Sequence, residues 1–148
     1  MSLFENWIFL GLGAALFFGI GAVMTKIAIG EKFFGMDPRA FGLLTVLGVA
    51  IVLAGYFFTS PTSIPTNPTF LGIGIGAGII YGLGQVLVLI AIKNNANIAQ
   101  LAPIYNINTL IAVILGIFLL SEIPSQTQAV KVLIGAILIT AGAVLVSG

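Results

Sequence analysis

The chain has 148 residues, of which 59% are hydrophobic and only 6% are charged, and its formal net charge is +1. Soluble domains average about 25% charged residues, so this chain has too little charge to cover a water-facing surface, and its composition indicates an integral membrane protein. A net charge near zero offers no basic patch for nucleic acid. The sequence has no cysteine and no histidine. Disulfides, thiol nucleophiles and the commonest zinc ligands are therefore excluded, and no cofactor is expected.

Five segments are long and apolar enough to cross a bilayer as helices, because a hydrocarbon core of about 30 Å requires roughly 20 residues. In chain order they run over about residues 7–29, 40–58, 70–92, 98–120 and 129–146. Irregular backbone cannot face lipid, so each segment should be helical. The connections are short, and consecutive helices should therefore run antiparallel. The sequence thus predicts a single all-α transmembrane domain over residues 1–148, with five helices in one compact bundle.

Helix-start signals support these boundaries. Each segment is preceded by a side chain that can accept hydrogen bonds from the free N–H groups of a first helical turn. Three of these have the spacing of a capping box and two precede a proline at the first helical position: Ser2 with Glu5, Asn97 with Gln100, Ser125 with Gln128, Asp37-Pro38 and Asn67-Pro68.

The few basic residues predict an orientation. With five spans the termini lie on opposite sides of the membrane, and the C-terminal side carries four cations: Lys26, Lys32, Arg39 and Lys93. The N-terminal side has only Lys131. The positive-inside rule then places the C-terminus in the cytoplasm and the N-terminus outside the plasma membrane. Because so few charges decide this, insertion in both orientations stays open as a second interpretation.

Two spans carry regularly spaced glycines. Gly74, Gly78 and Gly82 form a ladder along one face of the third span, and Gly135 and Gly142 share a face of the fifth. Small residues let membrane helices approach closely. One interpretation is helix packing within a single subunit. The other is a dimer interface on the fifth span and a mobile, cavity-lining third span.

Polar residues at membrane depth mark candidate functional positions, since they tend to face a cavity or another helix. The third span places Tyr81 and Gln85 four residues apart on one face. The first half of the fourth span holds five further candidates: Pro103, Tyr105, Asn106, Asn108 and Thr109. Pro103 can kink the helix and leave a carbonyl without a partner. These groups either hydrogen-bond between helices or line a substrate pathway.

The charged residues lie near the ends of the spans. Lys26 is close enough to the end of the first span for its amine to reach the headgroups, and Glu122 follows the fourth span. Both are interpreted as interface anchors. No aspartate or glutamate lies deep in a span, which disfavours an exchanger that uses a carboxylate in the middle of the membrane.

Several short motifs resemble those of a known family. They are Ala99-Gln-Leu-Ala-Pro103, an apolar run ending in Leu119-Leu-Ser-Glu122, Gln128, and Ile134-Gly-Ala-Ile-Leu-Ile-Thr-Ala-Gly142. Ala14-Ala-Leu-Phe-Phe-Gly19, followed by Lys26, extends the similarity to the first span. Together they resemble the EamA-type repeat of the drug/metabolite transporter superfamily. Pro103 and Glu122 match the family's positions by their order in the repeat.

The resemblance implies a particular architecture. Most members of this family carry two inverted five-helix repeats, so a chain with one repeat implies a half-sized transporter that needs a second copy. Such a homodimer would pair its two subunits in opposite orientations, as an antiparallel dimer. The superfamily also includes the small multidrug resistance proteins. Their essential first-helix glutamate has no counterpart here, because Phe18 stands eight residues before Lys26. Proton-coupled cation export is therefore not expected.

The leading functional hypothesis is a membrane transporter, or permease, of a small metabolite or drug-like solute that works by alternating access between two repeats. Its partners would be the solute, the lipid bilayer and a second copy of the chain. The alternative is a non-transporting membrane subunit that packs against another protein through its glycine faces. The sequence has no arrangement of nucleophile and base, so no enzymatic activity is expected.

Overall fold

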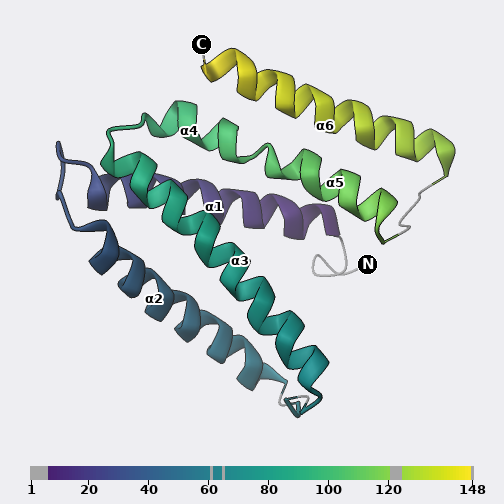
Figure 1. Cartoon of the computed structure of the whole chain (residues 1–148), viewed down its shortest axis with the longest axis horizontal. Coiled ribbons are helices and arrows are strands. Elements are labelled where there is room, and N and C mark those ends of the chain that lie inside the picture. The colour runs from purple at the N-terminus through teal and green to yellow at the C-terminus, as the bar shows by residue number, and fades with distance from the viewer. Residues whose placement is uncertain (1–6, 61, 65, 121–124, 148) are drawn as a thin grey trace. The chain divides into compact units, whose positions relative to one another are not determined.

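A computed structural model describes residues 7–60, 62–64, 66–120 and 125–147. In this part of the chain all regular structure is helical (Figure 1). The helices are α1 (Trp7–Ile29), α2 (Pro38–Thr59), α3 (Pro68–Lys93), α4 (Ile98–Tyr105), α5 (Asn108–Phe118) and α6 (Gln126–Ser147). They belong to two compact units, Met1–Asn95 and Ala96–Gly148.

The five predicted membrane spans are confirmed. Each of α1, α2 and α3 is long and apolar enough to cross a membrane, as are α6 and the stretch Ile98–Phe118 that contains α4 and α5. The prediction was wrong in one respect, since the fourth span is not a continuous helix from residue 98 to 120. It is interrupted between Tyr105 and Asn108, and its helical part ends at Phe118.

The predicted helix starts are largely observed. Asp37, Asn67 and Asn97 are the N-caps of α2, α3 and α4, and each side-chain oxygen accepts a hydrogen bond from the backbone N–H two residues later, at 2.7, 2.9 and 3.1 Å. The Ser125 hydroxyl donates to the Gln128 side chain at 3.3 Å at the start of α6. Ser2 and Glu5, and the anchor residue Glu122, lie outside the described residues.

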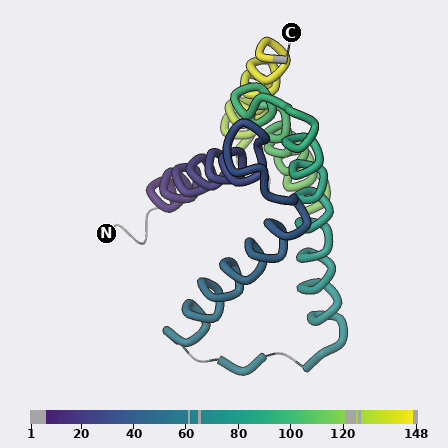
Figure 2. Tube along the Cα trace, turned by 90° about the vertical axis from the view of Figure 1, so that its left-hand side faces the viewer, coloured from purple at the N-terminus to yellow at the C-terminus, as the bar shows by residue number. Residues whose placement is uncertain are grey.

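In the first unit, α1, α2 and α3 pack together at one end. The buried residues lie at the C-terminal ends of α1 (Thr25 and Ile29) and α3 (Leu89 and Ile92). A Cβ placed on Gly42, near the start of α2, would lie 3.3 Å from a methyl group of Leu89, so α2 and α3 are in close contact there. Away from this end α2 and α3 diverge (Figure 2). Most of their side chains are exposed, as expected for helices surrounded by lipid.

The connection from α1 to α2 is a tight hydrogen-bonded turn. The N–H groups of Gly30, Phe34 and Met36 donate to the carbonyls of Lys26, Ile27 and Ala28, at 2.8, 3.2 and 2.8 Å. The last carbonyls of α1 are thereby satisfied by the chain itself rather than by water. Gly35 has a φ of +60°, a conformation that glycine adopts without strain.

In the second unit, α6 packs along both α4 and α5 (Figure 1). The most buried residues of α6 are Ala136 and Ala143, which are 3% and 1% exposed. They lie seven residues apart and so share one face of the helix. Small side chains at this face allow the backbones to approach closely, which is the main source of helix association in lipid.

Candidate functional site

The interruption of the fourth span is the main irregularity inside a membrane-spanning segment. α4 contributes eight residues before the break, in a span of 21 residues. At 1.5 Å per residue, the break lies about 12 Å into a segment about 31 Å long, near the middle of the membrane. Interruptions at this depth are tolerated where the backbone lines a cavity or is covered by protein.

Pro103 accounts for the start of the irregularity. It has no N–H to donate to the carbonyl of Ala99, so the regular hydrogen bonding of α4 already lacks one bond there. Farther along, the N–H groups of Ile107, Thr109 and Leu110 donate to carbonyls three residues back, at 3.1, 3.0 and 2.9 Å. This tighter spacing replaces the α-helical pattern around the break and changes the direction in which the following side chains point.

The break is surrounded by neutral polar side chains. Asn106, Asn108 and Thr109 are exposed, whereas Pro103 and Tyr105 are half-buried. The Thr109 hydroxyl lies 3.4 Å from Oδ1 of Asn108, which is a weak hydrogen bond at most. All five predicted residues of the fourth span thus lie at the break or within three residues of it. Two amides there retain hydrogen-bonding capacity for a ligand.

Tyr81 and Gln85 lie one helical turn apart in the middle of α3. Both side chains are exposed, and Tyr81 is 82% exposed. They belong to the first unit, whereas the polar residues around the break belong to the second. The Tyr81–Gln85 pair and the polar cluster at the break are therefore two separate groups, each within its own unit.

The candidate positions carry no charge. In the described residues of the spans, every lysine and arginine lies toward a helix end: Lys26 and Lys93 in the last turns of α1 and α3, Arg39 at the start of α2 and Lys131 near the start of α6. No group of three metal-binding side chains occurs in the described part of the chain. A ligand held here would be recognised by neutral hydrogen-bonding groups.

A family model for EamA-like transporters matches residues 5–148 of this chain. The chain belongs to the EamA-like transporter family. No curated protein and no solved structure matches the chain. Members of this family are membrane transporters of small solutes, and the five apolar helices agree with a multi-pass membrane protein. The match confirms the resemblance noted in the sequence.

Within this EamA-family repeat, the glycine faces are open. A Cβ added to Gly74, Gly78 or Gly82 on α3 would meet no other atom within 4 Å, and the same holds for Gly135 and Gly142 on α6. These glycines therefore make no close helix contact within their own units. On α6 the buried face is formed instead by the alanines that directly follow the two glycines. Sequence reasoning missed this face, although the regular spacing of Ala129, Ala136 and Ala143 could have indicated it.

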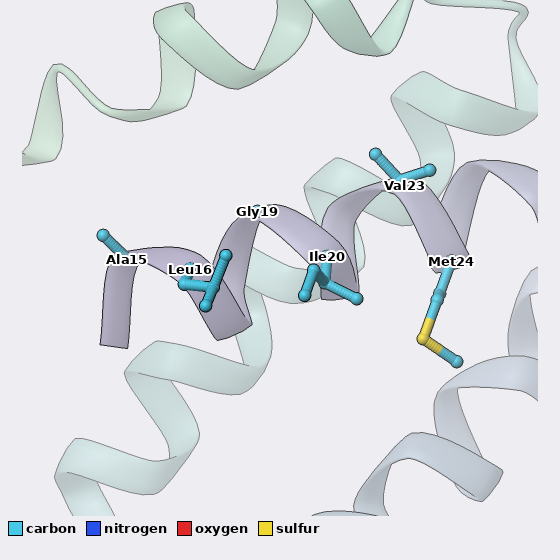
Figure 3. A pocket seen from close by; sticks show the side chains of 6 residues that line it. All are labelled: Ala15, Leu16, Gly19, Ile20, Val23 and Met24. Atoms are coloured by element: carbon cyan, nitrogen blue, oxygen red, sulfur yellow. The ribbon is translucent and has the colours of Figure 1, made fainter. Parts of the chain in front are cut away.

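A surface hollow of about 470 Å³ in the first unit of this EamA-family chain lies along α1 (Figure 3). Six residues line it: Ala15, Leu16, Gly19, Ile20, Val23 and Met24. All are apolar, so this hollow has no side chain that can orient a polar solute.

Proposed function

We propose that the chain is a carrier for a small neutral or drug-like solute, which binds at the break of the fourth span. The observation that carries this proposal is the interruption of a transmembrane helix near mid-membrane, beside exposed asparagines, in a member of a transporter family. In secondary transporters, substrates commonly bind where discontinuous helices leave backbone groups available.

The chemistry of the break suits such a solute. The backbone N–H groups of Ile107, Thr109 and Leu110 already donate to carbonyls of the chain, so the donors and acceptors for a solute come mainly from side chains. The amides of Asn106 and Asn108 add both kinds of group. Without a carboxylate or a cation at this depth, the site favours a molecule with hydroxyl, amide or carbonyl groups over a strongly charged ion.

Alternating access requires a second repeat. We propose that two copies pair as a homodimer, with Tyr81 and Gln85 of α3 facing the same pathway as Asn106. The exposure of Tyr81 and Gln85 and the open glycine faces of α3 and α6 support this arrangement, because polar groups and small residues at membrane depth need protein neighbours. The α3 glycines would let that helix move during the transport cycle.

The experiment is a ligand screen followed by a transport assay. Purified protein in detergent is heated with amino acids, nucleosides, sugars and organic dyes, and a compound that raises the thermal midpoint is then tested for uptake into proteoliposomes. We expect Asn106→Ala and Gln85→Ala each to lower the apparent affinity roughly two- to tenfold, the effect of losing one neutral hydrogen bond. Asn94→Ala, outside the spans, should leave uptake unchanged.

The non-transporting subunit gives the opposite result. In that case no compound stabilises the protein, empty and protein-containing liposomes take up the compounds at the same rate, and Asn106→Ala and Gln85→Ala lower only the thermal midpoint. This result would contradict the carrier proposal directly.

A further inference from the structure

A second hollow in the first unit combines positive charge with an apolar wall. It has a volume of about 240 Å³ and lies between the start of α2 and the end of α3. Its lining residues are Asp37, Pro38, Arg39, Val86, Leu89, Ile90 and Lys93. It is unrelated to the polar residues in the middle of the spans, because it lies at the end of both helices.

The polar part of this hollow has a net positive charge. Arg39 and Lys93 are both exposed cations, and Asp37 is the one carboxylate in the lining. That carboxylate already has a structural role, since Oδ1 accepts a hydrogen bond from the Arg39 backbone N–H at 2.7 Å and caps α2. Two cations against one acid leave the lining with a charge of +1, which suits an anion.

The apolar part of the hollow is well defined. Leu89 is only 6% exposed and packs against the start of α2 near Gly42, so its side chain forms the buried base of the hollow. Val86 and Ile90 are half exposed, at 50% and 49%. On α3, Ile90 lies within one turn of Lys93 and Val86 about two turns before it. They continue from the charged end of the helix toward the middle of the membrane, in the direction that an acyl chain would follow.

We propose that this hollow binds the headgroup and upper acyl chain of an anionic phospholipid. Arg39 and Lys93 would contact the phosphate, while Val86 and Ile90 would contact the first methylene groups. Basic hollows between membrane helices are typical sites for anionic lipid headgroups. The positive-inside prediction places this end of the unit at the cytoplasmic leaflet, where anionic lipids are concentrated.

Native mass spectrometry of the full chain tests the proposal. The protein in neutral detergent is mixed with phosphatidylglycerol, phosphatidylcholine or inorganic phosphate, and the bound fraction is measured. We expect retention of phosphatidylglycerol over both other probes. Each cation near an anionic lipid contributes a factor of roughly five in affinity, so Arg39→Gln with Lys93→Gln should weaken binding about 30-fold.

The control variants separate a lipid site from general effects. Lys131→Gln removes a cation from the other end of the spans and should leave binding unchanged, and Arg39→Lys should retain most of it. Circular dichroism shows whether the double variant is folded. Equal binding of phosphatidylcholine overturns the proposal, as does full retention of phosphatidylglycerol by the double variant. Displacement of the lipid by millimolar inorganic phosphate would make this a site for small anions instead.

Discussion

Replacing Gly30 should disturb the turn that follows α1 in the first unit. A Cβ at this position would lie 2.6 Å from the carbonyl oxygen of Lys26 and 3.2 Å from the ring of Phe33. The backbone atom cannot move away without breaking the hydrogen bond from Gly30 N–H to that same carbonyl, at 2.8 Å. The requirement for glycine here thus comes from close approach rather than from an unusual φ.

We predict that Gly30→Ala destabilises the chain by roughly 1–3 kcal/mol, the usual cost of forcing an extra methyl group into a packed position. The measurement is the thermal unfolding midpoint in detergent, followed by circular dichroism. Gly48→Ala is the matched control, because nothing lies within 4 Å of a Cβ added in the middle of α2. Equal midpoints for the two variants would contradict the observed turn.

The cap of α3 gives a second residue-scale prediction. Asn67 accepts a hydrogen bond from Thr69 N–H at 2.9 Å and precedes Pro68 at the first helical position. Asn67→Ala removes the acceptor and should cost about 0.5–2 kcal/mol of stability, whereas Asn67→Asp keeps it and should change stability little. Both effects are read from the same unfolding midpoint, and an alanine variant as stable as the aspartate variant would count against the cap.

At the scale of elements, α6 presents two adjacent faces with different roles. Ala143 is 1% exposed and faces the other helices of its unit, whereas Gly142 is exposed. We predict that Ala143→Leu pushes α6 away from its neighbours and lowers the free energy of unfolding by roughly 1–3 kcal/mol. Gly142→Leu, one residue earlier, should leave a folded chain. Similar losses for both variants would show that α6 is not packed through the alanine face.

The sequence predicted the spans well because apolar length and capping chemistry are local properties. Asp37, Asn67 and Asn97 act within two residues of their partners, so their roles follow from spacing alone. The break in the fourth span was only partly predictable. Pro103 indicated a kink, but the point at which the helix ends depends on the change to three-residue hydrogen bonds at Ile107, which spacing does not specify.

The packing faces were less predictable than the spans, for a related reason. Glycine and alanine both allow close approach, so the sequence alone cannot distinguish a face used inside the chain from one left for a partner. On α6 the structure assigns the alanines to the interior of the unit and leaves the glycines open. The candidate pathway residues are likewise divided, with Tyr81 and Gln85 in the first unit and Asn106 in the second. Whether they line one pathway depends on how repeats pair, and no local sequence pattern encodes that pairing.

For the whole molecule, the open glycine face of α6 leads to a prediction about oligomeric state. If two copies pair through this face, Gly142→Leu will shift the purified protein from dimer to monomer without lowering helical content, because a large side chain prevents the helices from approaching. Light scattering coupled to size-exclusion chromatography measures the change. A wild-type protein that is monomeric at all concentrations would contradict the homodimer.

The distribution of basic residues should also determine how the chain is oriented in the membrane. The first unit gathers the ends of α1 and α3 and the start of α2, and with them Lys26, Lys93 and Arg39, at its packed end. Four cations against one predict that most molecules insert with the N-terminus outside. Single cysteines at Ser2 and Ser147 report this when intact cells are treated with a membrane-impermeant thiol reagent, since the chain has no native cysteine.

We expect the Ser2 site to label in most molecules and the Ser147 site in a minority. The double variant Thr62→Lys with Ser63→Lys adds two lysines to the connection between α2 and α3, on the N-terminal side of the membrane. The C-terminal side then has four cations against three on the N-terminal side, instead of four against one. Labelling at Ser147 should then rise toward that at Ser2, while Thr62→Gln with Ser63→Gln should leave it unchanged. A wild-type chain that labels at both sites would supply both orientations for an antiparallel homodimer. Labelling at Ser2 alone, unaffected by the added lysines, would restrict the proposed dimer to parallel pairing, because rigidly fixed insertion provides no inverted copy.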